Sequence, residues 1–152
     1  MKLAEALISR ADHQRRLERL KLRLLRIAKV QEGDKPAEKP ADLLKEIERL
    51  SESLVRLIQR INETNSSTML EAGQTITDAI AIRDILKLRY NVYIELAKAA
   101  AITQGRTTKS EVKFKSTVEI VEIQKKADEL AKEYRKLDTK IQEANWLTDL
   151  KE

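Results

Sequence analysis

The sequence predicts an all-α fold, an elongated antiparallel bundle of four long helices, and three observations support it. Glycine and proline number only 3 and 2 among 152 residues, so the chain has little material for the turns of a many-stranded fold. Charged residues make up 36% of the chain and aromatic residues 3%, which is typical of long helices with an aliphatic core. Apolar residues recur at heptad spacing, which keeps them on one face of a helix.

The first helix is expected over residues 2–31. Its apolar stripe consists of Leu17, Leu20, Leu24 and Ile27. Four more apolar residues lie off that stripe and predict a second contact surface: Leu7, Ile8, Leu22 and Leu25. Gly33 follows and can adopt the left-handed conformation that ends a helix, while two prolines close the break at positions 36 and 40.

The second helix is expected over residues 41–65, with a strict heptad stripe from Leu43 to Ile61. Small polar residues after it predict a loop over 65–75. The third helix is expected over residues 76–103, where Thr75 and Asp78 fit a helix start. Apolar residues occupy two neighbouring sides of this helix, so we expect it to be the most buried one.

The fourth helix is expected over residues 117–145, opened by a capping box at Ser116–Glu119. Its stripe has no interruption: Ile120, Ile123, Ala127, Leu130, Tyr134, Leu137, Ile141 and Ala144. Before it, apolar and charged residues alternate with a period of two, which predicts a short extended or hairpin arm near residues 106–115. We expect all four helices to form a single domain over residues 1–152.

Neither a catalytic centre nor a metal or cofactor site is predicted. The chain has no cysteine, which excludes disulfides, thiolate metal ligands and cysteine nucleophiles. Its only histidine, His13, has no Glu-x-x-His pairing of the kind that di-iron bundles use. The three glycines are isolated, so no phosphate-binding loop exists. The chain is therefore predicted not to be an enzyme.

Four polar residues are candidates for a buried polar contact or an anion contact: Arg10, His13, Gln142 and Asn145. Arg10 and His13 fall on the backward extension of the leucine stripe of the first helix. A buried arginine needs a charge partner, so we predict a carboxylate beside Arg10, with Asp84 and Glu95 as candidates. A structural role for these groups and a ligand-binding role both remain open.

The net charge of +5 comes from the first helix, because residues 1–31 hold nine basic and three acidic residues (+6) and the rest of the chain holds 21 basic and 22 acidic residues (−1). Five arginines give it a possible basic surface: Arg15, Arg16, Arg19, Arg23 and Arg26. Clustered cations could bind nucleic acid or another polyanion. However, aromatic residues are not interleaved with them, and the acidic second helix could neutralise them within the fold, so a nucleic-acid partner is not expected.

No apolar run approaches the roughly 20 residues of a membrane-spanning helix, and the N-terminal segment does not read as a signal peptide. The expected location is therefore the cytoplasm. Surplus apolar surface on the first and third helices predicts a homo-oligomer. The identity of any small-molecule ligand stays open.

Four segments resemble the septicolysin-like family of small, largely uncharacterised bacterial helical proteins. They are residues 6–12 (ALISRAD), 28–33 (AKVQEG), 60–65 (RINETN) and 141–146 (IQEANW). The resemblance covers nearly the whole chain and implies a self-associating helical bundle, with no catalytic residue to carry over. The family name implies a pore-forming or membrane-active toxin, which makes that activity the alternative to a non-enzymatic interaction protein. Anion or nucleic-acid binding through the basic first helix is the third possibility.

Overall fold

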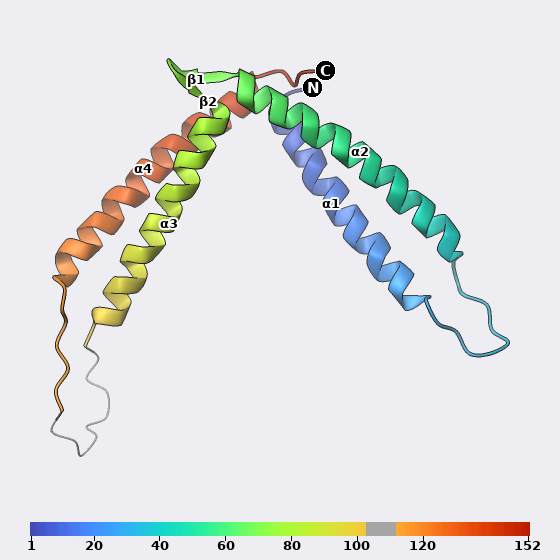
Figure 1. Ribbon diagram of the computed structural model, residues 1–152, viewed down its shortest axis with the longest axis horizontal. Coiled ribbons are helices and arrows are strands. Elements are labelled where there is room, and N and C mark those ends of the chain that lie inside the picture. The colour runs from blue at the N-terminus through green and yellow to red at the C-terminus, as the bar shows by residue number, and fades with distance from the viewer. Residues whose placement is uncertain (103–111) are drawn as a thin grey trace. The chain divides into compact units, whose positions relative to one another are not determined.

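The computed structural model describes residues 1–102 and 112–152 and confirms the all-α fold with four long helices (Figure 1). The helices are α1 (Leu3–Arg26), α2 (Pro40–Ser67), α3 (Ile76–Ala100) and α4 (Ile120–Leu147). Two short strands, β1 (Met69–Glu71) and β2 (Gln74–Thr75), pair in a small sheet between α2 and α3. The contacts divide the chain into a first unit, residues 1–69 and 142–152, and a second unit, residues 70–141.

The first unit is built on the pairing of α1 with α2, which lie side by side in Figure 1. Leu20 from α1 meets Leu43 and Leu50 from α2 in a buried cluster. The remaining members of the cluster are half-buried: Leu17, Leu24, Ile27 and Ile47. These are the heptad stripes that the sequence predicts, so one apolar face on each helix is enough to hold this pair together.

The ends of the described chain are fastened to each other within the first unit. Residues 2 and 149 form an isolated antiparallel bridge, in which the Leu3 amide donates to the Thr148 carbonyl at 2.9 Å. The Leu150 amide donates to the Met1 carbonyl, also at 2.9 Å. The Lys2 ammonium forms an ion pair with Asp149 at 2.8 Å. Residues 148–152, the C-terminal tail, thus pair with the first residues of the chain (Figure 1).

The C-terminal tail is also held by α2. The Lys151 amide donates to the Thr64 hydroxyl oxygen at 3.0 Å, and that hydroxyl donates to the Arg60 carbonyl at 2.7 Å. The Arg60 Nε donates to the Lys151 carbonyl at 2.7 Å. Thr64 is fully buried, and Leu150 is buried as well. The Thr64 hydroxyl is the only polar group of that side chain. It accepts from the tail and donates within α2, which satisfies a buried hydroxyl.

The second unit is built on α3 and the part of α4 up to Ile141, which run side by side in Figure 1. Ala79 and Leu86 of α3 are buried, as are Ala127 and Leu130 of α4. All eight residues of the predicted α4 stripe, including Ala144 outside this unit, are buried or half-buried. The seam of the fourth helix is confirmed as core.

Several predicted boundaries were wrong by a few residues. Helix α1 ends at Arg26 rather than at residue 31, and Gly33 (φ +90°) lies in a separate turn closed by the Asp34 amide and the Gln31 carbonyl. That turn needs the same positive φ that a helix end would need, so glycine alone does not distinguish the two. The predicted loop over 65–75 contains the β1–β2 hairpin, where Gly73 has φ +77°.

The start of α4 also differs from the prediction. The Ser116 hydroxyl accepts from the Val118 amide at 3.2 Å and forms a local turn, while the Ile123 amide donates to the Glu119 carbonyl. The helix therefore begins at Ile120, four residues after the predicted cap. Most of the predicted arm near 106–115 falls on residues 103–111, which lie outside the described residues, and residues 112–115 have neither helix nor strand.

The start of α3 is as predicted. The Asp78 amide donates to the Thr75 hydroxyl at 3.1 Å, and the Thr75 amide donates to the Asp78 carboxylate at 2.9 Å. These contacts make a reciprocal capping box. The hydrogen bonds from Thr75 lower the pKa of Asp78, because they favour its charged form.

Candidate functional site

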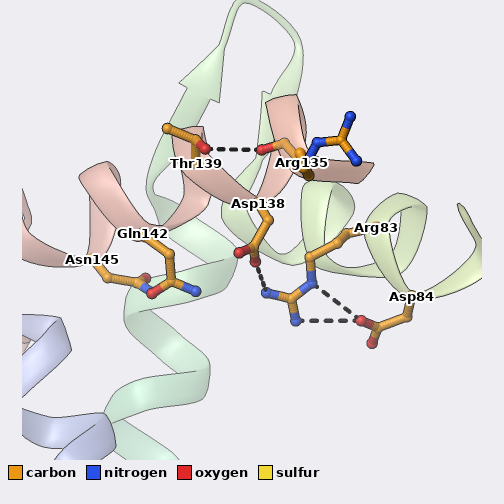
Figure 2. Close-up of polar contacts among 7 residues, drawn as sticks. All are labelled: Arg83, Asp84, Arg135, Asp138, Thr139, Gln142 and Asn145. Atoms are coloured by element: carbon orange, nitrogen blue, oxygen red, sulfur yellow. Dashed lines mark hydrogen bonds and ion pairs between the residues drawn. The ribbon is translucent and has the colours of Figure 1, made fainter. Parts of the chain in front are cut away.

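The most enclosed ion pair of the described residues joins the two helices of the second unit (Figure 2). Arg83 on α3 donates through Nη1 to the Asp138 carboxylate on α4 at 2.9 Å. Its Nε and Nη2 both lie 3.3 Å from the neighbouring Asp84 carboxylate. The Arg83 side chain is 21% exposed and that of Asp138 is 32% exposed. One guanidinium thus connects two carboxylates across the α3–α4 seam.

The electrostatics of this cluster are those of a structural ion pair. Burial alone would lower the pKa of Arg83, but the hydrogen bonds to Asp138 and then Asp84 outweigh it, so its pKa is raised. An arginine whose pKa is raised stays charged at every physiological pH and cannot transfer a proton. The geometry therefore ties the two helices together through a guanidinium that stays charged.

The structure places Arg10 and His13 on α1, where both are half-buried. His13 Nδ1 donates to the Ser9 carbonyl at 2.8 Å, a contact within the helix that fixes the imidazole ring. The carboxylate partner predicted for Arg10 is not found among residues 1–102 and 112–152. Asp84, one of the two candidates for that role, instead forms its ion pair with Arg83.

Asn145 and Gln142 lie one turn apart near the end of α4 (Figure 2). Asn145 is buried at 5% exposure, and its Nδ2 lies 3.5 Å from Gln142 Oε1. Gln142 itself is exposed. One buried polar atom that the sequence does not single out is Oδ1 of Asn65, which has no hydrogen-bond partner among the described residues. The four polar candidates are thus divided between the two helices α1 and α4.

The basic surface of α1 is partly neutralised by neighbouring carboxylates. Arg16 forms an ion pair with Glu46 of α2 at 2.7 Å, and Arg23 pairs with Glu38. Arg15 pairs with Asp12 on its own helix. Arg19 and Arg26 are exposed, with no ion pair to any residue in the described ranges. Much of the predicted anion-binding face is therefore used within the fold.

Hydrogen bonds from arginines also lower the pKa values of two carboxylates beside this face, Glu38 and Glu46. The hydrogen bond from Arg23 lowers the pKa of Glu38 below its ordinary value of 4.5. The hydrogen bond from Arg49 does the same for Glu46, with a smaller Coulombic contribution from Arg16. Both carboxylates are therefore charged at neutral pH and stay available as partners for the arginines.

A pocket of about 180 Å³ opens between α3 and α4 within the second unit. It is lined by Tyr90, Ala131 and Tyr134, together with the charged residues Lys87 and Arg135. The two tyrosines and the alanine are half-buried, whereas Lys87 and Arg135 are exposed. The sequence places Tyr90 and Tyr134 only on apolar helix faces, because a periodicity does not show where two facing side chains leave a space.

The described parts of the chain contain neither a metal-binding cluster nor a membrane-spanning helix. No group of three or more histidine, aspartate or glutamate residues there is placed to hold a metal ion. Spanning a bilayer takes a helix that is both long and apolar, and none of the described helices meets that requirement.

Known proteins that resemble this chain match it over nearly its whole length. The model of a family of unknown function (DUF6847) matches residues 10–150. A crystal structure of a functionally unknown conserved protein from Corynebacterium diphtheriae is similar, with 47% identity, coverage of 99% of both chains and a TM-score of 0.94. No curated protein matches. The predicted resemblance to the septicolysin-like family was therefore wrong, since the matched family is a different one whose function is unknown.

Proposed function

The chain belongs to the family of unknown function DUF6847, and on that premise we propose that it is a non-enzymatic cytoplasmic protein that associates with a second copy of itself through the outer face of α3. A single observation carries this proposal: α3 has large aliphatic side chains on the side facing away from its core contacts. The exposed residues are Ile82, Ile85, Leu88, Val92 and Leu96.

The geometry of a helix explains why these five residues form one surface. At about 100° per residue they span an arc of roughly 120°, and buried Ala79, Leu86 and Ala97 lie on the neighbouring side, roughly 110° from the centre of that arc. We call this exposed arc the outer face of α3. A helix that is apolar on two neighbouring sides is typical of one with a partner on each of them.

The aliphatic residues of the outer face can pair with one another in one antiparallel register, in which Leu88 lies opposite the aliphatic stem of Arg89. If two copies of α3 cross antiparallel about the midpoint between Leu88 and Arg89, Ile85 of one copy lies opposite Val92 of the other. In the same register Ala81 lies opposite Leu96, so that a small residue receives a large one. A twofold interface of this kind uses the same surface on both copies, which is the commonest form of homodimer.

The non-enzymatic part of the proposal is supported by the kinds of group whose pKa is shifted. The arginines with a raised pKa are Arg23, Arg49 and Arg83, all held by carboxylates, and Asp78 caps a helix. Such shifts belong to structural contacts, whereas a catalytic acid or base needs a pKa near the working pH. The cytoplasmic location is supported by the absence of cysteine, which suits a reducing compartment.

Light scattering coupled to size exclusion tests the association. We expect the wild-type mass at micromolar concentration to be a multiple of the single-chain mass of 17.5 kDa. Val92→Glu should return the mass to one chain, because a charge would be buried at the interface. The matched control is Val55→Glu on α2, since both valines are 54% exposed. A single-chain mass for the wild type, or an equal effect of both variants, would overturn the proposal.

The absence of cysteine allows a second test of the same surface. Leu88→Cys places a thiol beside the proposed twofold axis, so mild oxidation should crosslink two copies through one disulfide. Val55→Cys should stay largely uncrosslinked under the same conditions.

Location is checked separately by fractionating cells that express the untagged chain.

A further inference from the structure

We propose that the pocket between α3 and α4 binds a small monocarboxylate that carries one aromatic ring. This inference goes beyond self-association and concerns the core-facing side of α3, because Tyr90 lies about 140° around the helix from the centre of the outer face. The residues that carry it are the five that line the pocket: Lys87, Tyr90, Ala131, Tyr134 and Arg135.

The size of the pocket selects a ligand with one ring. Its volume is about 180 Å³. An apolar cavity of about 150 Å³ holds one benzene molecule, so a ring with a short polar substituent fits here and a fused ring system does not. Two tyrosine rings make up much of the wall, and aromatic faces and edges favour stacked or edge-to-face contact with a second ring.

The charge of the pocket selects an anion. Both charged residues in the lining are cations, and no carboxylate lines the pocket. Neither Lys87 nor Arg135 forms a side-chain ion pair within residues 1–102 and 112–152. In Figure 2 the only marked contact of Arg135 is at its backbone, where the carbonyl oxygen accepts a hydrogen bond from the Thr139 hydroxyl, and no dashed line reaches its guanidinium. A carboxylate between these two cations would receive charge-assisted hydrogen bonds.

The tyrosine rings by themselves would also suit a cation, because the face of an aromatic ring attracts positive charge. Lys87 and Arg135 exclude that alternative, since a cationic ligand would meet two like charges at the edge of the pocket. The hydroxyls of Tyr90 and Tyr134 form no hydrogen bond with other described residues, so both can donate to the ligand.

Ala131 leaves the space in which the ring would lie. It is half-buried on α4, between the buried Leu130 and the seam residue Tyr134. A larger aliphatic residue at this position would fill the space between the tyrosine rings, which makes Ala131 the position at which the pocket can be closed without removing a charge.

Benzoate is the probe, with benzamide as its neutral counterpart of nearly the same shape. We expect saturable binding of benzoate by calorimetry in the millimolar range or tighter, and roughly tenfold weaker binding of benzamide, because only benzoate can form ion pairs with both cations. In amide NMR spectra of the full chain, the largest shifts on addition of benzoate should fall on residues 87–90 and 131–135.

Substitutions in the pocket, compared with one elsewhere on α3, show whether benzoate binds in the pocket. Lys87→Gln and Arg135→Gln should each weaken benzoate binding about two- to fivefold, the effect of removing one exposed charge pair. Lys98→Gln is the matched control, because Lys98 is an exposed lysine on nearly the same side of α3, about 16 Å further along the helix axis. It should leave the affinity unchanged.

Ala131→Leu should abolish binding while circular dichroism stays that of the wild type, and Ala131→Val serves as a smaller replacement if leucine disturbs the helices. Equal affinity for benzoate and benzamide, NMR shifts centred on other residues, or no saturable binding at 10 mM benzoate would each overturn the inference, where that concentration lies about tenfold above a millimolar Kd. Because the outer face of α3 is elsewhere on the helix, Val92→Glu should bind benzoate like the wild type whether or not the chain self-associates.

Discussion

The two units of this chain are each built on a pair of antiparallel helices, but they treat the outer surfaces of those helices differently. In the first unit, α1 and α2 bury one apolar stripe each and connect their rims through ion pairs such as Arg16–Glu46. The exposed Ile8, Leu22 and Leu25 of α1 share its outer side with exposed arginines. In the second unit, α3 buries one side and exposes five large aliphatic residues on a neighbouring side, with Arg89 as the charge among them. The difference teaches that exposed aliphatic residues mixed with several charges form a solvated surface, whereas an exposed helix face that is mostly aliphatic has contacts left to make.

The largest expected effects come from the two cores, where we predict that the units behave alike. Leu50→Ala in the first unit and Leu130→Ala in the second each remove a buried leucine, with 3% and 0% exposure. Each should lower the free energy of unfolding by about 2–5 kcal/mol through lost burial and the cavity left behind. Urea denaturation measures this. Val55→Ala on α2, at a site 54% exposed and outside the proposed interface, is the control and should change stability by less than about 0.5 kcal/mol.

The next largest effect concerns the C-terminal tail, a feature of the first unit. Thr64→Val preserves shape but removes the acceptor of the Lys151 amide and the donor to the Arg60 carbonyl. We expect a loss of about 1–3 kcal/mol in the free energy of unfolding, because an amide is left without its partner in a buried place. Hydrogen exchange at the Lys151 amide should also speed up. An unchanged exchange rate would show that the tail does not depend on this hydroxyl.

Breaking an ion pair between two helices should cost more stability in the second unit than in the first. Arg83→Met breaks a pair in the second unit whose side chains are 21% and 32% exposed, and about 1 kcal/mol of stability should be lost, with the remaining exposure limiting the effect. Arg16→Met breaks the corresponding pair of the first unit, in which the arginine is 55% exposed, and no measurable loss is expected. Equal losses of unfolding free energy for the two variants in urea denaturation would contradict this prediction.

The smallest expected effect is the response of the first unit to acid. The Arg23 hydrogen bond lowers the pKa of Glu38 below its unfolded value near 4.5, so its stabilising contribution is present above that pH. This contribution is lost as the pH falls through the lowered pKa, because both states then bind the proton. Arg23→Gln should therefore show a shallower loss of thermal stability than the wild type between pH 5 and pH 3. Parallel curves for the two proteins would contradict the prediction.

Much of the fold could be predicted from spacing alone. The stripes of the first, second and fourth helices are confirmed because a heptad repeat states which side of a helix is apolar. Spacing does not state which helices pair, since all the stripes are aliphatic and similar. It also misplaced the Ser116 cap and the end of α1, because the same residue types satisfy turns and helix ends.

The candidate site could be predicted less well than the fold. Arg83 and Asp138 are far apart in the sequence and lie on no recognisable motif, so only the packing of α3 on α4 reveals their ion pair. The tyrosine pocket has the same origin, because Tyr134 reads as an ordinary member of an apolar stripe until Tyr90 is seen beside it. The stripe position of Arg10 predicted a buried side chain with a carboxylate beside it. Arg10 is half-buried and has no such partner among the described residues. The reason is that the long side chain of an arginine can reach water from a helix edge.

The fastening of residues 148–152 to residues 1–3 has a consequence for how the chain reaches its native state. These contacts join segments that are nearly the full length of the chain apart, so they close the longest loop available and their entropy cost is the highest of any contact. They also hold the two ends within hydrogen-bonding distance. A circular permutant, with residues 152 and 1 joined by a short glycine–serine linker and new ends opened between α1 and α2, would turn this most distant contact into a local one. It should fold faster while keeping the same helices.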